Sequence, residues 1–237
     1  YTKGVHAYRH DVICDQATLD ISDHSPVIVD FDLCDAAPVI TCDYPCGNVK
    51  VLSVDEEKGV VEIAPDLCDT VGHWFHFDFT VRGAEGKTLK FQFPKDGMSY
   101  LSSLGPAICR DGQNWTWLKA DGRRHEPDNA FTFAFGKEDH AVRFAVSIPY
   151  GQKEWEDFTA RWRQDPRVRF GVLCKSHSGT RDVELLRVPC RGKAEYLFVL
   201  TARHHACETT GNPPMEGALQ ELLSDSDEGR WAREHAE

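Results

Sequence analysis

The chain has 237 residues, of which 41% are hydrophobic and 11% aromatic, and its formal net charge is -11. This composition is typical of globular protein and excludes a disordered tail, and the length suffices for one large domain or two modest ones. An acidic surface repels phosphate backbones, which argues against nucleic-acid binding by the bulk of the chain. No apolar run approaches the roughly 18 residues of a membrane-spanning helix, so we expect no membrane partner.

The chain contains nine cysteines, an odd number spread along its whole length. This pattern is not that of a disulfide framework, and we expect reduced, mostly buried thiols in a cytoplasmic protein. Cys42 and Cys46 have a tolerable spacing for zinc ligands, but no second Cys/His pair follows at finger spacing, so a structural zinc there is only the alternative.

The first residue is Tyr1 and not Met, which we interpret as a processed or cut chain.

The sequence pattern before residue 151 predicts mainly β-strands. Residues 27–33 alternate apolar and polar side chains, which predicts a strand with one buried face. A linker with Pro38 and Pro45 follows. We then expect short strands broken by Gly and Pro turns, including a hairpin at Gly59, in an antiparallel β-sandwich with an aromatic core. An exposed tryptophan platform for sugars is the alternative use of the aromatics. The expected strands are 49–54, 60–63, 74–81, 89–93, 115–118, 130–135 and 142–148.

After residue 150 the pattern becomes that of an α/β protein. An amphipathic helix is expected over 154–164, followed by strands at 170–174, 183–188 and 196–202. The last of these is almost wholly apolar, which predicts a central strand buried on both faces. Pro213 and Pro214 precede a helix at 215–223. The charged run with Glu228, Arg230 and Arg233 reads as a solvated helix or tail.

His205 and Glu208 follow the apolar run at 196–202 directly. The carboxyl end of a sheet strand is where α/β folds place their sites. A catalytic zinc takes three protein ligands and keeps an open position for water, and a His and a Glu three residues apart on a tight turn can converge on one ion. Taken alone, this spacing occurs often by chance, and the alternative is that His204 and His205 are surface polar residues.

Several segments in a fixed order resemble the zinc metallocarboxypeptidases, specifically the cytosolic-carboxypeptidase-like branch with an N-terminal β-sandwich. The resemblance covers about residues 38–237. It implies that His205 and Glu208 are zinc ligands, with His204 a neighbour, and that the substrate is the C-terminus of a peptide or protein. The segments that carry it are 47–48, 72–77, 86–93, 105–112 with Trp115 and Trp117, 142–144, 148–150, 173–181 and 201–208.

The chain also departs from this family. The third zinc ligand of the family is a His far downstream, and His235 is too near to take its place. The substrate-binding Arg and the Glu general base would lie beyond Glu237, so the catalytic residues are unknown here. The prolines at 213–214 are expected to delay a helix that starts without interruption in the family. We therefore expect a fragment, inactive as this chain alone.

The first 33 residues resemble a different group, the C-terminal end of an endonuclease/exonuclease/phosphatase superfamily domain. The resemblance rests on Ser-Asp-His-Ser-Pro at 22–26 before an alternating strand. It implies that Asp23 and His24 serve phosphodiester hydrolysis, the His as acid/base with the Asp in support. A chance occurrence of the five residues is the alternative.

Three parts are thus expected: a tail of another enzyme domain at 1–33, a β-sandwich at 38–150 and the start of an α/β, carboxypeptidase-like catalytic domain at 151–237. The leading hypothesis is a fragment of a zinc exopeptidase. The competing hypotheses are a sugar- or protein-binding sandwich that carries a decayed peptidase remnant, and a phosphodiesterase or nuclease tail acting through His24.

Overall fold

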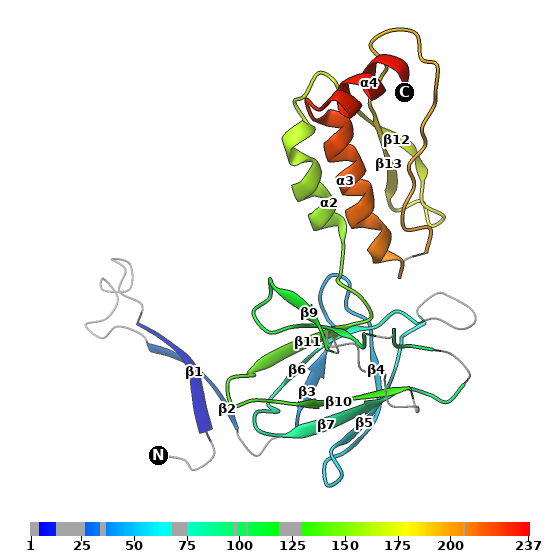
Figure 1. The fold of residues 1–237 in the computed structure, drawn as a ribbon. Helices are drawn as coiled ribbons and strands as arrows, with labels where there is room; N and C mark the ends of the chain where they lie inside the picture. The colour runs from blue at the N-terminus through cyan, green and yellow to red at the C-terminus, as the bar shows by residue number, and fades with distance from the viewer. Residues whose placement is uncertain are drawn as a thin grey trace. The chain divides into compact units, whose positions relative to one another are not determined.

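The structure is a computed structural model of the whole chain. It describes residues 5–12 and 27–33 by their backbone, and residues 37–67, 75–96, 99–102, 104–118, 129–205 and 207–237 with their side chains. The chain divides into two compact units, Tyr1–Val146 and Ser147–Glu237 (Figure 1). Among the described residues, no helix combines the length and the apolar character that crossing a bilayer requires.

The first unit begins with a two-stranded antiparallel sheet. Strand β1 (Val5–Val12) pairs with β2 (Val27–Leu33), and the register shifts between Ala7 and Arg9. The predicted strand at 27–33 is therefore confirmed. The motif at 22–26, with Asp23 and His24, lies outside the described residues.

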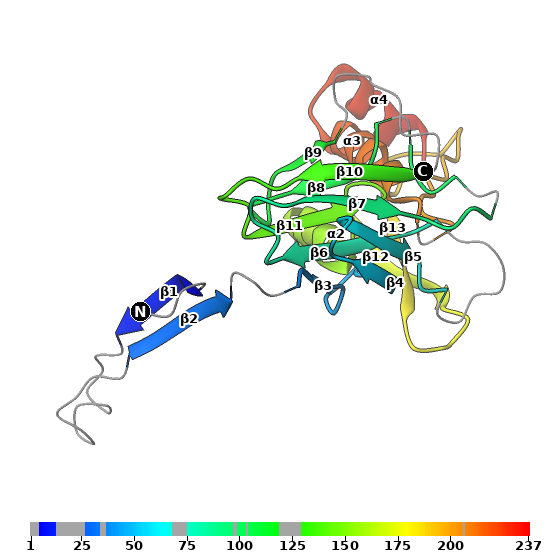
Figure 2. The same ribbon diagram turned by 90° about the horizontal axis from the view of Figure 1, so that it is seen from below.

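Two larger sheets make up the rest of this unit. One has four strands in the order β10-β7-β5-β4, and the other has five in the order β3-β6-β11-β8-β9 (Figure 2). Each strand expected between residues 49 and 148 is present, several of them shortened at their ends, and two further strands, β3 and β8, were not predicted. The bounds are β3 Val39–Thr41, β4 Lys50–Asp55, β5 Val60–Ala64, β6 Asp78–Arg82, β7 Thr88–Gln92, β8 Ala107–Cys109, β9 Trp115–Trp117, β10 Ala130–Ala134 and β11 Ala141–Ala145.

Glycines with positive φ occur in two connections, one of which closes a hairpin while the other leads from one sheet to the other. Gly59 has φ +63°, a left-handed conformation that favours glycine, and it closes the expected β4–β5 hairpin. Gly83 and Gly86 also have positive φ, but they lead from β6 in one sheet to β7 in the other. One pair departs from the antiparallel expectation, since β5 and β7 run parallel.

The aromatic side chains of both sheets meet in one buried cluster. Phe144 on β11 lies 5.4 Å from Phe91 on β7 and 5.3 Å from Phe131 on β10, measured between ring centroids. All three side chains are fully buried. Burial of one such ring contributes about 1.5–3 kcal/mol, so these aromatics are core, as the sequence predicts. Trp115 and Trp117 on β9 are half-buried.

A buried ion pair ties β6 to β11 at one edge of this cluster. The Asp78 side chain is fully buried and accepts hydrogen bonds of 2.7 Å from both Nε and Nη2 of Arg143. The hydroxyl of Tyr44 donates to the same carboxylate at 3.1 Å. Burial raises the pKa of Asp78, and the hydrogen bonds from Arg143 and Tyr44 offset only part of this effect.

The second unit packs helices on a β-hairpin (Figure 1). Helix α2 and the hairpin β12–β13 match the predicted helix and strands, with a short 3₁₀ turn after α2. Phe158 and Trp162 lie in a cluster with Val168, Val188 and Leu219, which brings α2, the hairpin flanks and α3 together. The bounds are α2 Gln152–Thr159, the 3₁₀ turn Ala160–Trp162, β12 Arg169–Lys175, β13 Asp182–Arg187, a second 3₁₀ turn Thr209–Gly211, α3 Asn212–Leu223 and α4 Asp227–His235.

The two prolines do not delay α3. The helix starts at Asn212, and Pro213 and Pro214 occupy its first turn. A proline fits there because the first backbone N–H groups of a helix have no intrahelical partner. The helix predicted at 215–223 therefore starts three residues earlier than expected.

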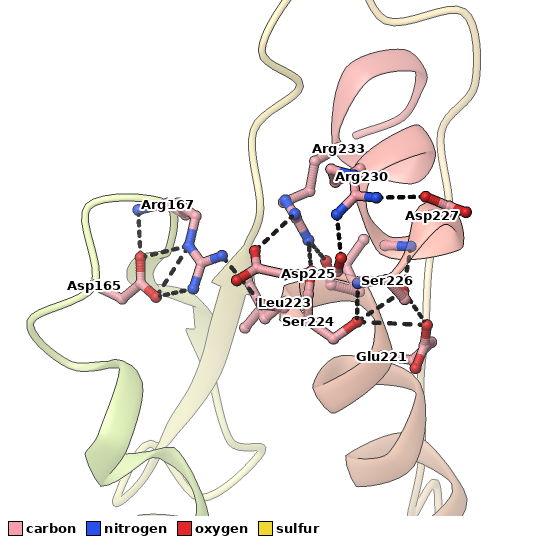
Figure 3. A network of polar contacts seen from close by, with 12 residues as sticks. Asp165, Arg167, Glu221, Leu223, Ser224, Asp225, Ser226, Asp227, Arg230 and Arg233 are labelled. Carbon is pink, nitrogen blue, oxygen red and sulfur yellow. Dashed lines mark hydrogen bonds and ion pairs between the residues drawn. The ribbon is translucent and has the colours of Figure 1, made fainter.

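Two arginine side chains cap the C-terminal end of α3 by hydrogen bonds to its carbonyl oxygens (Figure 3). Arg167 Nη1 donates to the carbonyl oxygen of Leu223 at 3.1 Å, and Arg233 Nη1 donates to that of Ser224 at 2.7 Å and to that of Leu222. The last carbonyls of a helix lack intrahelical partners and carry partial negative charge. Arg233 is only 2% exposed, so its prediction as a solvated residue was wrong, although Glu228 and Arg230 on α4 are exposed.

Residues 196–202 are not the buried central strand that their apolar run predicts. They form no strand, and Leu197 and Val199 are each 73% exposed. Backbone hydrogen bonds join one edge of the segment to residues 235–237, with a parallel bridge between Tyr196 and Ala236. A groove of about 750 Å³ lies between this segment and helices α3 and α4, with Phe198, Leu222 and Trp231 in its lining.

Candidate metal centre

The candidate site lies on the turn that joins the apolar segment to α3. Arg203 has φ +63°, an uncommon conformation for a residue with a side chain, and it redirects the chain at the start of the turn. The backbone N–H of Glu208 donates to the carbonyl oxygen of His205 at 3.1 Å. The 3₁₀ turn and α3 follow at once. The turn is therefore compact and runs directly into a helix.

His205 and Glu208 are brought into contact by this turn. Nδ1 of His205 lies 2.7 Å from Oε1 of Glu208, and the backbone N–H of His205 donates to Oε2 at 3.0 Å. The side chains are 62% and 44% exposed, so a solute can reach them. The hydrogen bonds from the imidazole and the backbone of His205 lower the pKa of the Glu208 carboxyl, which keeps it ionised at neutral pH.

The two donors fit part of a zinc site. Zinc binds imidazole nitrogen and carboxylate oxygen at about 2.0–2.2 Å, so two such ligands in a tetrahedral site lie about 3.3 Å apart. For Nδ1 and Oε1, at 2.7 Å, to share an ion, Nδ1 must give up the proton that it donates to Oε1 and the two atoms must separate slightly. Over the described part of the chain, no group of three or more His, Cys, Asp and Glu side chains is placed to hold a metal. Among the described residues, this turn thus brings two potential metal ligands together, one fewer than a catalytic zinc takes.

The other sequence candidates lie apart from this pair or outside the described residues. His204 is exposed. His235 stacks on Trp231 and its Nδ1 lies 3.1 Å from Glu195, so it is engaged elsewhere on the second unit. In the first unit, Cys42 donates through Sγ to the carbonyl oxygen of Val49 at 3.6 Å. The six cysteines among the described residues form no disulfide bond, and two of them, Cys109 and Cys207, are buried, so the expectation of mostly buried thiols was wrong for this part of the chain.

Sequence reasoning missed the residues that hold the turn in place. The Thr209 side chain, next to Glu208, is buried and donates to the carbonyl oxygen of Ile148 at 2.9 Å. Its oxygen also lies 2.6 Å from Oγ of Ser147. Thr209 lies 61 and 62 positions from its partners Ile148 and Ser147 in the chain. Contacts over such separations leave no local sequence pattern, so only the folded structure reveals them.

Comparison with known proteins identifies relatives of this chain. No model of a protein family matches it. It is 26% identical over 233 residues to cytosolic carboxypeptidase 3 of Mus musculus, an alignment that covers 86% of this chain and 23% of the mouse protein. A metallo-carboxypeptidase structure from Pseudomonas aeruginosa superposes with a TM-score of 0.68 at 26% identity, covering 84% of this chain and 53% of that one. This chain is related to the metallocarboxypeptidases.

A metallocarboxypeptidase relationship fits the resemblance noted in the sequence, and the fold agrees. The bacterial structure from Burkholderia mallei described as a putative carboxypeptidase reaches a TM-score of 0.70 at 18% identity, which is a likeness of fold. An uncharacterized protein of Zymomonas mobilis is 27% identical over 192 residues, 79% of this chain and 48% of that protein. The chain therefore spans about half of that protein, and about a quarter of the mouse carboxypeptidase.

Proposed function

We propose that this chain is part of a zinc-dependent metallocarboxypeptidase that releases C-terminal residues from peptides, with His205 and Glu208 as two of the zinc ligands. The observation that carries the proposal is the 2.7 Å approach of His205 Nδ1 to Glu208 Oε1 on an exposed turn at the start of α3. The metallocarboxypeptidase relatives support it, because the matches with them cover 86% and 84% of this chain.

The proposed organisation follows the same family. Residues 38–150 are an N-terminal β-sandwich, and residues 151–237 are the start of the catalytic α/β domain. Residues 1–33 are the tail of a possible endonuclease/exonuclease/phosphatase domain. We place the protein in the cytoplasm, which the cytosolic carboxypeptidases among its relatives support.

The two candidate ligands, His205 and Glu208, supply only part of the chemistry that peptide hydrolysis requires. A bound zinc ion would polarise the carbonyl of the scissile peptide bond and lower the pKa of the water molecule bound to the zinc. His205 would contribute an imidazole nitrogen, which has to be deprotonated to bind a metal, and Glu208 would contribute a carboxylate oxygen. No third ligand lies beside them among the described residues, and the proposal includes no general base in this chain. We therefore expect weak zinc binding and no peptidase activity from this chain alone.

Zinc binding tests the ligand assignment. Titration calorimetry of the purified chain should show weak binding that His205→Ala abolishes. His204→Ala is the matched control, because it removes an exposed imidazole one residue away, and it should bind zinc as the original chain does. Tight binding that survives His205→Ala would contradict the assignment and direct attention to Cys42 and Cys46.

The expected inactivity has its own test. The chain is incubated with zinc and peptides that carry acidic, basic or aromatic C-terminal residues, and released amino acids are measured. No release is expected. Release that disappears in Glu208→Gln would show instead that another residue of this chain completes the site.

A further inference from the structure

A short segment at the start of the second unit contacts both flanks of the candidate turn. On the C-terminal flank, Thr209 is 3% exposed and donates to the carbonyl oxygen of Ile148. A threonine hydroxyl has a single hydrogen, and that hydrogen is used in this bond. The hydroxyl of Ser147, which is 8% exposed and 2.6 Å away, must therefore donate to Thr209. The two hydroxyls and the carbonyl form an ordered chain of donors and acceptors.

The N-terminal flank is held by the same segment. The side chain of Arg203 donates through Nη1 to the carbonyl oxygen of Tyr150. Tyr150 is itself fixed to α3, because its hydroxyl donates to Oε1 of Glu216 at 2.5 Å. Burial, followed by the hydrogen bond to Glu216, raises the pKa of the Tyr150 hydroxyl, so it remains a donor at neutral pH. Residues 147–150 thus bridge the turn from Arg203 to Thr209 and extend to α3.

The candidate ligands lie between these two anchors. The His205 and Glu208 side chains are 62% and 44% exposed, and they contact each other. Exposed side chains are fixed less firmly by packing than buried ones, so the backbone at the two flanks contributes to their direction. Thr209 is bonded directly to Glu208 in the chain, so loss of its hydrogen bonds would free the backbone that carries the carboxylate. A site whose supporting groups are loose loses affinity even when its ligands are present.

We propose that Thr209 and Ser147 are positioning residues that hold His205 and Glu208 in ligand-ready geometry. This inference rests on the proposed function of the pair as zinc ligands. Removing a group that hydrogen-bonds a metal ligand directly costs about 10–100-fold in metal affinity, and the loss here should lie near the lower end because Thr209 acts through the backbone. The hydroxyl of Thr209 is the critical group, because it accepts from Ser147 and donates to the carbonyl oxygen of Ile148.

The test uses the full chain and three threonine variants. Thr209→Val keeps the shape and removes the hydroxyl, while Thr209→Ser keeps the hydroxyl. Thr159→Val is the matched control, because Thr159 is also fully buried and its hydroxyl also donates to a carbonyl, that of Trp155 at 2.8 Å within its own helix. Two quantities are measured: amide hydrogen exchange at His205 and Glu208 without metal, and zinc affinity by competition with a chromophoric chelator.

Thr209→Val should speed exchange of the two amides and weaken zinc binding about tenfold or more. Thr209→Ser should restore both quantities, and Thr159→Val should change neither. Unchanged exchange and affinity in Thr209→Val would overturn the inference. If Thr209→Val does not fold, Ser147→Ala removes the donor to the same hydroxyl and should change both quantities in the same direction.

The two proposals can fail separately. If the original chain shows no zinc binding that depends on His205, the proposed function is wrong. Amide exchange without metal then decides the positioning role by itself: faster exchange in Thr209→Val supports it, and unchanged exchange overturns it.

Discussion

Arg233 on α4 donates to the carbonyl oxygen of Ser224, just past the end of α3, at a distance of 2.7 Å (Figure 3). A second bond from the same nitrogen reaches the carbonyl oxygen of Leu222. The cation lies where the helix concentrates its partial negative charge and its unpaired acceptors. Because the side chain is almost wholly buried, water cannot replace it in these bonds. This contact fixes α4 against α3.

Arg233→Met should therefore destabilise the second unit by about 2 kcal/mol, since the apolar side chain fills the space but the carbonyl oxygens of Leu222 and Ser224 lose hydrogen bonds from a charged group. Arg230→Met is the matched control on the same helix, because its side chain is 49% exposed; it should cost less than about 0.5 kcal/mol. Urea denaturation followed by circular dichroism measures both. Equal losses in the two variants would contradict the capping role of Arg233.

In the first unit, Arg143→Met should cost about 3 kcal/mol of unfolding free energy. The substitution leaves the fully buried carboxylate of Asp78 without its cation, and an uncompensated buried charge is expensive. Arg110→Met breaks a comparable bond to Asp139 at 2.8 Å, but its side chain is 50% exposed. That change should cost less than about 1 kcal/mol. The same denaturation experiment compares them, and a larger loss in Arg110→Met would refute the argument.

The pair Asp165 and Arg167 gives a prediction about pH. Hydrogen bonds from the side chain and backbone of Arg167 lower the pKa of Asp165 from its ordinary value of 3.8. A carboxyl whose pKa is depressed in the folded state contributes stability above the unfolded pKa and loses it as pH falls through the folded pKa. Asp165→Asn should thus be less stable than the original chain by about 1 kcal/mol near neutral pH. The difference should shrink below pH 3.8.

Unfolding free energies of the two proteins, measured from neutral pH down to the acid range, check this window. Asp225→Asn serves as the control, because that carboxylate is 94% exposed and lies 3.9 Å from Arg233. A gap between Asp165→Asn and the original chain that stays constant through the acid range would contradict the assignment.

How far the sequence predicts this fold depends on the range of the interactions. Alternating Phe residues such as Phe91 and Phe131 identified strands correctly, because one buried face imposes a period of two. Gly59 marked a hairpin because its backbone conformation is set locally. The partners of those strands were not predictable in the same way, and the parallel pairing of β5 with β7 has no sequence signal.

The candidate site shows the same limit. The spacing of His205 and Glu208 is local, and the structure brings their side chains together as that spacing suggests. Ser147 and Ile148, which support the adjoining Thr209, are more than 60 positions away in the chain. Arg233 was misjudged for a related reason: a charged residue in a polar run looks solvated until the helix end that it caps is known. The contact between neighbouring residues could be predicted from the sequence, and the contacts with residues far away in the chain could not.

The apolar segment at 196–202 yields the last prediction. Its sequence indicates an interior strand, yet Phe198 is 60% exposed and only one edge of the backbone is paired, with residues 235–237. A segment with few buried contacts and partial pairing opens at low free energy, which makes it susceptible to proteases. Chymotrypsin should therefore cut after Phe198 before it cuts after Phe79 or Phe91, whose side chains are fully buried in the first unit.

Mass spectrometry of the early fragments identifies the first bond broken. Phe198→Ser is the informative variant, because it removes the preferred site at a position where little apolar area is buried. Its unfolding free energy should change by less than about 0.5 kcal/mol, whereas Phe91→Ala should cost about 3–5 kcal/mol. If Phe198→Ser is as costly as Phe91→Ala, and the bond after Phe198 resists cleavage, then the segment is covered in solution and the interior strand predicted from its sequence is formed after all.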